Sequence, residues 1–166
     1  PANITLHGRT LRQLYQGSAD WAAIGRATQV VHSHGGHILG NGDVLSLQDG
    51  LERVEKYGVD GFLIGRAAEG NPGVFLQSSE PCLVCGEQGS ELCVHKRMSW
   101  LVEHTEVYES IFKPAIEVAG DYRWFMPMRK HLAWYCKGFE GAVEMRSRLM
   151  LTNSVEEVRE IVSDLG

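Results

Sequence analysis

The sequence predicts an α/β fold, in which consecutive strand–helix units form a parallel sheet, followed by a segment that contains helices alone. Three short apolar runs support this prediction, at residues 4–6, 38–40 and 61–64, and a segment with helical periodicity separates each run from the next. Each run ends in glycine and polar side chains. Because parallel α/β folds bind ligands at the carboxyl ends of their strands, we expect a ligand site where these runs end.

Each of the first two strand-like runs leads into an expected helix. Ser18 is placed to cap the first helix, whose apolar stripe has helical spacing and consists of Trp21, Ile24, Ala27, Thr28 and Val31. In the second helix, Ser46 and Asp49 have capping-box spacing and Gly58 stands at the expected C-terminal position. The strands read as short continuous apolar runs, so we expect both of their faces to be covered.

The character of the chain changes after Asn71-Pro72-Gly73. We expect part of a β/α domain over 1–76, a cysteine-containing loop or insertion over 77–97, and a helical domain over 98–166. The expected helices are a long one from Met98 to Val118 with a possible kink at Pro114, one from Pro127 to near Gly138, one from Phe139 to Met150, and a last one with a Ser154–Glu157 capping box.

Three parallel strands do not make a stable β/α domain, because the sheet would expose two long apolar edges. The remaining strands therefore lie upstream on the natural chain or come from a partner, and we favour the first alternative. The chain begins at Pro1, almost inside a strand, which we interpret as a truncated start.

The distribution of charge is more informative than its total. The formal net charge is -5 at pH 7, which argues against a general nucleic-acid coat, yet residues 121–150 hold six basic residues against three acidic ones. Such an excess is typical of a surface that faces an anion, and a solvated helix face is the alternative. No apolar run approaches the roughly 20 residues of a membrane span, and no signal peptide is visible. We expect a cytoplasmic protein with no membrane partner.

Two strand ends carry groups suited to a phosphorylated ligand. In Asn41-Gly42-Asp43 the glycine permits close approach of the backbone, and the flanking side chains can form hydrogen bonds to a ligand. Gly65-Arg66 follows the next strand, where an amide, a helix N-terminus and a guanidinium would bind phosphate. A tight turn with an Asp cap is the alternative for the first motif alone. The occurrence of both motifs favours a phosphorylated cofactor.

Two groups of possible metal ligands are present. Cys82, Cys85, Cys93 and His95 have partial zinc-ligand spacing, and an irregular loop with incidental thiols is the favoured interpretation over zinc. His32, His34 and His37 lie between a helix and a strand, at the amino ends of the strands. We expect these three to be surface histidines.

Several motifs, spaced in a specific order, connect the chain with a known family. They are His7-Gly8-Arg9-Thr10, Tyr15-Gln16-Gly17, Ala19-Asp20-Trp21, Gly40-Asn41-Gly42-Asp43, Gly58-Val59-Asp60-Gly61, Ile64-Gly65-Arg66-Ala67-Ala68, Gly70-Asn71-Pro72 and Met128-Arg129-Lys130-His131-Leu132-Ala133-Trp134-Tyr135. This series resembles the tRNA-dihydrouridine synthases. The resemblance covers nearly the whole chain except about residues 77–120.

The resemblance implies a flavoenzyme with a TIM (β/α)8 barrel, of which this chain would hold strands six to eight, and a helical domain that binds tRNA. Such an enzyme reduces the 5,6 double bond of particular uridines: NADPH reduces FMN, the flavin passes hydride to the uracil, and a cysteine donates a proton. The implied cofactor-binding residues are His7, Asn41, Gly42, Asp43, Gly65 and Arg66. The implied substrate and tRNA contacts are Arg9, Arg129, Lys130 and His131.

The sequence departs from the family in one important respect. The catalytic cysteine of the family lies in an Asn-x-Gly-Cys-Pro motif, which this sequence lacks, and its own cysteines have other neighbours. We therefore expect no catalytic residue in this chain, a proton donor upstream in the missing N-terminal half of the barrel, and an inactive chain on its own. The alternatives are a non-catalytic tRNA-binding remnant and another FMN-barrel oxidoreductase that acts on a small molecule.

Overall fold

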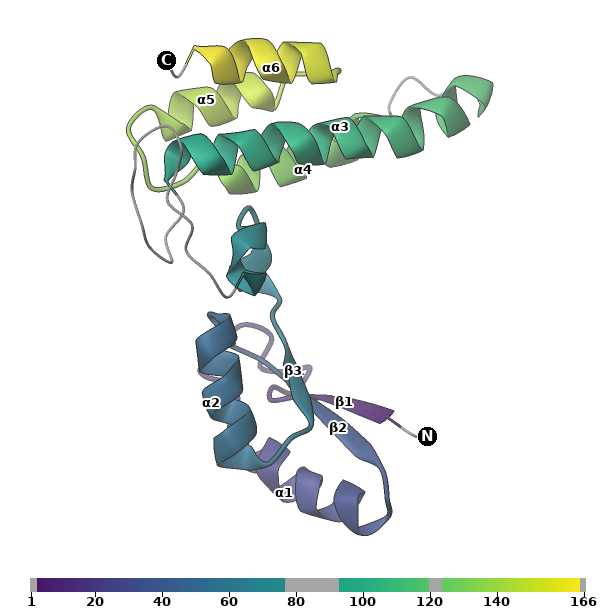
Figure 1. The fold of residues 1–166 in the computed structure, drawn as a ribbon, viewed down its shortest axis with the longest axis vertical. Helices are drawn as coiled ribbons and strands as arrows, with labels where there is room; N and C mark the ends of the chain where they lie inside the picture. Colours follow the sequence, from purple (N-terminus) through teal and green to yellow (C-terminus); the bar gives the residue numbers. More distant parts are fainter. Residues whose placement is uncertain (1–2, 77–92, 120–123, 165–166) are drawn as a thin grey trace. The chain divides into compact units, whose positions relative to one another are not determined.

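The computed structural model describes residues 3–76, 93–119 and 124–164 of the chain (Figure 1). In chain order, the first elements are β1 (Asn3–His7), α1 (Trp21–Ser33), β2 (His37–Asn41), α2 (Leu47–Tyr57), β3 (Gly61–Leu63) and the 3₁₀ helices η1 (Arg66–Ala68) and η2 (Pro72–Phe75). Four helices follow, namely α3 (Val94–Ala119), α4 (Met126–Tyr135), α5 (Ala142–Leu149) and α6 (Val155–Ser163). The described residues are thus α/β in class: strands alternate with helices early in the chain, and only helices follow.

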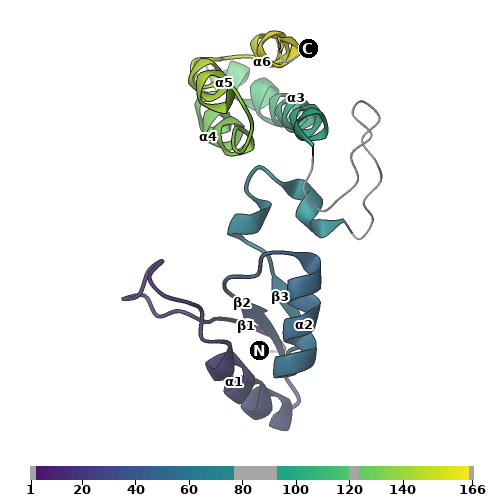
Figure 2. The same ribbon diagram turned by 90° about the vertical axis from the view of Figure 1, so that its left-hand side faces the viewer.

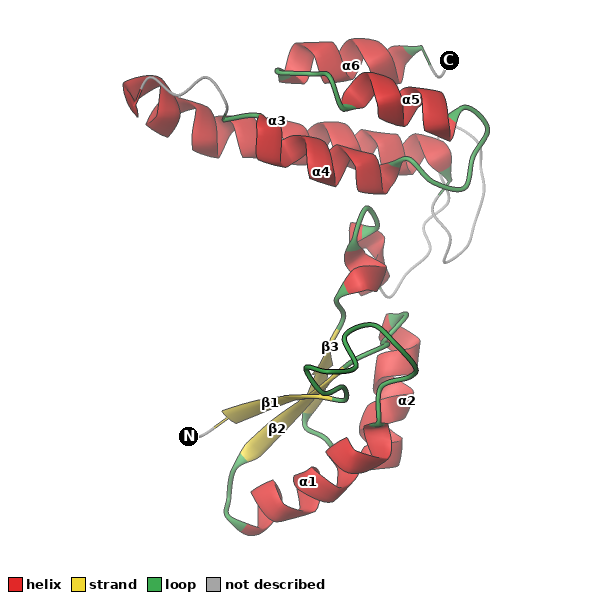
Figure 3. Cartoon of the chain, turned by 180° about the vertical axis from the view of Figure 1, so that it is seen from behind, coloured by secondary structure: helices red, strands yellow, loops and turns green. Residues whose placement is uncertain are grey.

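The described residues divide into two compact units. The first contains residues 3–68 and 74–76, and the second contains residues 69–73, 93–119 and 124–164. All three described strands belong to the first unit, and the α-helices described in the second unit are α3 to α6 (Figure 3).

The sheet of the first unit is parallel and has the order β1-β2-β3. Ile4 is paired with Ile38 and His7 with Asn41, so that β1 and β2 end at the same level, and Asn41 is paired with Leu63 of β3. Because each strand returns through a helix, all three carboxyl ends meet at one edge of the sheet. The polar residues that follow the strands are therefore brought together, as the sequence predicts.

Helices α1 and α2 contact each other and pack on the sheet (Figures 1 and 2). Trp21 is central to their core. Its indole is 3% exposed, donates a hydrogen bond to the Gly42 carbonyl at 2.7 Å, and has the guanidinium of Arg53 4.8 Å from its ring centroid. The buried core around it consists of Trp21, Ile24, Ile38, Val44 and Val59.

The termini of these helices confirm most of the predicted capping. The Ser46 hydroxyl accepts a hydrogen bond from the Asp49 amide, and Gly58 ends α2 in the left-handed conformation at φ 73°. The prediction of Ser18 as the cap of α1 is wrong: the cap is Asp20, whose carboxylate accepts from the Ala23 amide at 2.8 Å. The helix begins only at Trp21, so the N2–N3 amides lie within reach of Asp20 and not of Ser18.

The strands are covered less completely than expected. Ile38 and Gly40 are buried, but no residue of β1 is, and Ile4 and Leu63 remain 38% and 39% exposed. Since strand side chains alternate between the two faces, the described residues cover one face of the sheet and leave the other accessible.

The second unit is a packed set of helices in which α3 contacts α4 and α6, and α5 contacts α4 and α6. Its buried core consists of Met98, Leu101, Phe125, Met128, Leu132, Tyr135, Cys136, Met145, Leu149, Val158 and Ile161. Helix α3 begins at Val94, earlier than the predicted Met98, so residues 94–97 do not belong to a loop. Helix α5 begins at Ala142, because Gly141 has a φ of 80° and stands outside the helix.

Other predicted features of the helical unit are confirmed. Pro127 lies in the first turn of α4, and the Ser154 hydroxyl caps α6 by accepting from the Glu157 amide. Pro114 stands inside α3, and the kink expected there stays a prediction. None of the helices in the described part of the chain has the length and apolar character that crossing a bilayer requires.

Because Gly40 lies in close contact with Trp21, we expect a larger residue at position 40 to destabilise the first unit. A Cβ added at Gly40 would lie 2.5 Å from the indole ring, which cannot move without losing its hydrogen bond to Gly42. We expect Gly40→Ala to lower the free energy of unfolding of the first unit by about 1–3 kcal/mol, as overpacked cores do.

Urea unfolding followed by NMR at the β2 amides measures this change. Gly65→Ala is the matched control, because a Cβ there would meet no heavy atom within 4 Å. Its effect is expected to stay within about 0.5 kcal/mol. Equal stability of the two variants would contradict the packing argument.

Candidate functional site

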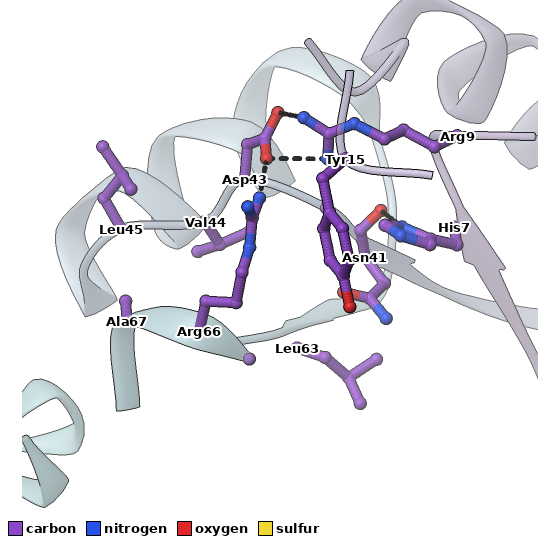
Figure 4. A pocket seen from close by; sticks show the side chains of 12 residues that line it. His7, Arg9, Tyr15, Asn41, Asp43, Val44, Leu45, Leu63, Arg66 and Ala67 are labelled. Carbon is purple, nitrogen blue, oxygen red and sulfur yellow. Dashed lines mark hydrogen bonds and ion pairs between the residues drawn. The ribbon is translucent and has the colours of Figure 1, made fainter. Parts of the chain in front are cut away.

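A pocket of about 480 Å³ lies at the carboxyl ends of the three strands (Figure 4). This volume falls within the range of about 300–1,000 Å³ that is usual for small-molecule sites. The pocket is lined by His7, Arg9, Tyr15, Asn41, Gly42, Asp43, Val44, Leu45, Leu63, Gly65, Arg66 and Ala67. It therefore brings together all six residues predicted to bind a cofactor, together with Arg9.

Asp43 is the centre of the polar network in the pocket. Its Oδ1 accepts hydrogen bonds from Arg9 Nη1 at 2.8 Å and Arg66 Nη2 at 2.7 Å (Figure 4). Its Oδ2 accepts from Arg9 Nη2 at 2.6 Å and from the Ala19 amide at 2.8 Å. The carboxylate thus joins the ends of β1 and β3 to the segment that precedes α1.

The electrostatics of this network favour a bound anion. The hydrogen bonds from Arg9 hold the pKa of the Asp43 carboxyl below its ordinary value, against the opposing effect of burial. Asp43 is therefore ionised at neutral pH and compensates one of the two guanidinium groups. The second positive charge, on a side chain of Arg66 that is 55% exposed, remains available to a ligand.

Two glycines shape the pocket in different ways. Gly42 has a φ of 127°, and a Cβ there would lie 2.7 Å from the Ala19 Cβ and 3.1 Å from His7 Nδ1, so this position is confined to glycine. Gly65 borders open space instead, since a Cβ would meet no heavy atom within 4 Å. A ligand can consequently approach the backbone at Gly65.

His7 and Asn41 offer polar groups on the other side of the pocket. The His7 ring donates through Nδ1 to the Asn41 carbonyl at 3.0 Å, which fixes the ring and leaves Nε2 for another partner. Within the described residues, the Asn41 side-chain amide is not engaged in a hydrogen bond and can both donate and accept.

Two expectations for this pocket differ from the observed arrangement. Arg9 was expected to face substrate, but its side chain is 5% exposed and is held by Asp43 and by the Gly17 carbonyl at 2.7 Å. The helix after Gly65 is η1, a 3₁₀ helix of three residues, too short to supply the expected helix dipole. The positive charge of the site therefore resides in the arginine side chains.

Tyr15 also lines the pocket, although its sequence motif predicts no role for it. Its ring centroid lies 5.4 Å from the Arg66 guanidinium, and the side chain is 77% exposed. Its motif, Tyr15-Gln16-Gly17, is eight residues beyond the first strand, and only the path of the intervening loop brings the ring to Arg66.

Two of the histidines near the amino ends of the strands are bonded to the carboxylate of Asp60. His32 Nε2 and His37 Nδ1 donate to the two oxygens of Asp60, at 2.9 Å and 3.2 Å, and the Ile38 amide donates to the same carboxylate. These hydrogen bonds, led by that of His32, lower the pKa of Asp60. The expectation of surface histidines agrees with their exposed side chains.

Of the four zinc-ligand candidates, Cys82 and Cys85 lie outside the described residues. Cys93 precedes α3 and His95 lies in its first turn. In the part of the chain that the structure describes, no three ligating side chains are grouped for a metal ion.

The Arg129-Lys130-His131 motif lies on α4, where successive residues point in different directions. Arg129 is half-buried and bonded to other parts of the fold: its Nε donates to the Thr152 carbonyl at 2.8 Å and its Nη2 to Asn153 Oδ1 at 2.6 Å. Lys130 is exposed, with its Nζ 4.9 Å from the Trp134 ring centroid. These two neighbours therefore have different environments.

His131 is half-buried between aromatic neighbours. Its ring centroid lies 4.8 Å from that of Trp134 and 5.2 Å from that of His104, which in turn contacts the Tyr135 hydroxyl. Burial lowers the pKa of both histidines. Lys130 lowers the pKa of His131 further, against the opposing effect of Glu69, and His131 lowers the pKa of His104 further. Tyr135 itself is 4% exposed and belongs to the buried core of the helical unit.

Comparison with known proteins places the chain among related sequences. Residues 2–165 match the family described as Dihydrouridine synthase (Dus). The chain is 32% identical over 159 residues to "Probable tRNA-dihydrouridine synthase 1" of Synechocystis, covering 96% of this chain and 41% of that protein. It is 32% identical over 162 residues to "Probable tRNA-dihydrouridine synthase" of Rickettsia conorii, covering 97% and 45%. It is also 32% identical over 156 residues to "tRNA-dihydrouridine synthase B" of Pseudomonas putida, covering 94% and 42%. The chain thus spans less than half the length of these relatives.

The contrast between Arg129 and Lys130 can be tested by stability. We expect Arg129→Met to lower the free energy of unfolding of the helical unit by about 1–3 kcal/mol, because a hydrogen-bonded charge is lost and the carbonyl of Thr152 loses its partner. Lys130→Met, on an exposed position of the same helix, is expected to change it by no more than about 0.5 kcal/mol. Urea unfolding followed at the α4 amides gives both values, and equal losses in the two variants would contradict the assignment.

Proposed function

The chain belongs to the dihydrouridine synthase family, and we propose that it forms part of an oxidoreductase that reduces uridine to 5,6-dihydrouridine in tRNA. The observation that carries this proposal is the open pocket at the strand ends, where Arg66 stands beside Gly65 with unbalanced positive charge. The relatives named above are tRNA-dihydrouridine synthases in name.

The residues of the pocket fit FMN. Arg66 and the open backbone at Gly65 would hold its phosphate, since a guanidinium forms charge-assisted hydrogen bonds with phosphate oxygens. His7 Nε2 and the Asn41 amide would bind the polar edge of the ring system, and Gly42 keeps His7 and Ala19 close enough for that wall to form. When bound, FMN reduced by NADPH would supply the hydride for the uracil ring.

The remaining part of the barrel is proposed to come from the rest of the protein. The β1 edge and one face of the sheet are uncovered by the described residues, which is the condition expected for strands that close into a TIM barrel with others. The greater length of the relatives supports the same proposal. The proton-donating cysteine would lie in that part, because none of the cysteines here has the family's motif.

The helical unit is proposed to bind tRNA through its exposed basic residues. Lys130, beside the Trp134 ring, is the candidate phosphate contact, whereas Arg129 is engaged within the fold. Phosphate contacts of this kind supply affinity without reading sequence. Arg9 is not proposed as a substrate contact, because Asp43 and Gly17 already hold it in a buried position.

A flavin titration tests the phosphate site. The isotopically labelled 166-residue chain is titrated with FMN and with riboflavin, which lacks the phosphate, and the amide shifts of residues 65–68 are followed by NMR. We expect FMN to bind about tenfold or more tightly than riboflavin, because hydrogen bonds to charged groups contribute roughly 1.5–3 kcal/mol.

Arg66→Ala should abolish that preference, while Arg26→Ala is the matched control. The Arg26 side chain is 70% exposed in the same unit, and its nearest acidic partner, Asp20, lies 4.0 Å away. Equal affinities of the unaltered chain for the two flavins would refute the proposed phosphate site.

The enzymatic proposal is tested in bacteria that lack their own dihydrouridine synthases, with dihydrouridine in tRNA measured by mass spectrometry. We expect none from the chain alone. We expect dihydrouridine from a chimera in which the chain follows the N-terminal part of the Synechocystis relative. If the chain alone forms dihydrouridine, the expectation that it lacks the proton donor is wrong. A flavin-bound chimera that forms none would favour a non-catalytic tRNA-binding role or a small-molecule substrate.

A further inference from the structure

We propose that Arg9 and Asp43 are positioning residues that hold Arg66 ready for the phosphate of the ligand. This inference rests on the proposed phosphate site. Arg66 is anchored by the hydrogen bond from its Nη2 to Asp43 Oδ1, and the same oxygen accepts from Arg9 Nη1. The second carboxylate oxygen accepts from Arg9 Nη2 and from the Ala19 amide. With four hydrogen bonds on two oxygens, the carboxylate has one orientation, and it confers that orientation on Arg66.

The support behind Asp43 is itself rigid. Asp43 has a φ of 54°, a left-handed conformation in which aspartate and asparagine are among the better tolerated residues. Its carbonyl accepts from Arg53 Nη2 at 3.1 Å, and Arg53 is in turn bonded to Asp49. Arg9 is also fixed, because it donates to the Gly17 carbonyl and its side chain is 5% exposed.

Such an anchor matters because an exposed arginine is otherwise flexible. Ordering a long side chain upon binding costs conformational entropy, and a side chain that is already ordered avoids that cost. Arg66 has five N–H donors, and a single hydrogen bond to Asp43 leaves others for phosphate oxygens. Asp43 thereby keeps an exposed cation in place without occupying all of its donors.

Positioning and simple charge compensation predict opposite effects of one substitution. If Asp43 only offset positive charge, Asp43→Asn would raise the charge of the pocket and strengthen binding of FMN relative to riboflavin. If Asp43 positions Arg66, the same substitution weakens that preference. The asparagine NH₂ group cannot accept hydrogen bonds. In place of Oδ2 it leaves Arg9 Nη2 and the Ala19 amide without an acceptor, and in place of Oδ1 it does the same to Arg9 Nη1 and Arg66 Nη2, so the anchor loosens either way.

The test is the ratio of riboflavin to FMN dissociation constants, measured by NMR titration of the full 166-residue chain. We expect Asp43→Asn to reduce this ratio by at least about threefold, as misplaced contacts do. We expect the same direction for Arg9→Lys, because a single ammonium cannot replace the fork that bonds both oxygens. When Arg66 is already replaced by alanine, Arg9→Lys should not reduce the ratio further. If the two residues contributed independently, the effects of the two substitutions would add.

Arg26→Lys is the matched control and should leave the ratio unchanged. If the unaltered chain binds FMN and riboflavin equally well, both the proposed phosphate site and this inference are refuted. The positioning role alone would be overturned by one combination of results: Arg66→Ala abolishes the preference for FMN, but Asp43→Asn and Arg9→Lys leave it unchanged or increase it.

Thermal unfolding of each variant separates positioning from a purely structural role. If either Asp43→Asn or Arg9→Lys lacks a cooperative unfolding transition, the riboflavin-to-FMN ratio of the other variant tests the positioning role. If both lack it, the two residues are structural and the positioning role is refuted.

Discussion

Four hydrogen bonds converge on the carboxylate of Asp43, and they come from three separate segments of the chain. Arg9 follows β1, Ala19 precedes α1, and Arg66 follows β3, while Asp43 itself follows β2. A carboxylate in this position ties together the ends of all three parallel strands, beyond the last backbone hydrogen bond between them, from the Gly8 amide to the Asn41 carbonyl. The shape of the pocket and the placement of its exposed guanidinium both depend on this one acidic side chain.

A second carboxylate, that of Asp60, connects several segments at the amino ends of the strands. Asp60 accepts from the Ile38 amide at the start of β2 and from His32 at the end of α1, and its own amide donates to the Ile38 carbonyl. Both aspartates have lowered pKa values because hydrogen bonds stabilise their ionised forms. The difference is that Asp60 accepts from histidine rings and a backbone amide, whereas Asp43 leaves one guanidinium partly exposed to a pocket. The second arrangement is the one at which we propose an anion site.

In the helical unit, two adjacent basic residues of one sequence motif have different surroundings. Arg129 links α4 to the segment before α6 through Thr152 and Asn153, and this contact stabilises the packing of the helices. Lys130 lies at the surface beside Trp134, where it is accessible to a phosphate backbone. A step of one residue along a helix rotates the side chain by about 100°, so adjacent basic residues rarely share a surface.

The sequence by itself determined the features that depend on neighbours a few residues apart. The three strands, the helices between them, the Ser46 and Ser154 caps and the glycine end of α2 follow from periodicity and capping geometry. The convergence of the strand ends also follows, since parallel strands must return to the same edge. Only the tertiary structure decided how the charged groups pair. Arg9 and Asp43 are 34 residues apart, and Arg129 and Thr152 are 23 apart. Many carboxylates and carbonyls could accept from each arginine, and spacing along the chain cannot rank them. The choice depends on the register that aligns His7 with Asn41 and on the loop that brings Ala19 to Asp43.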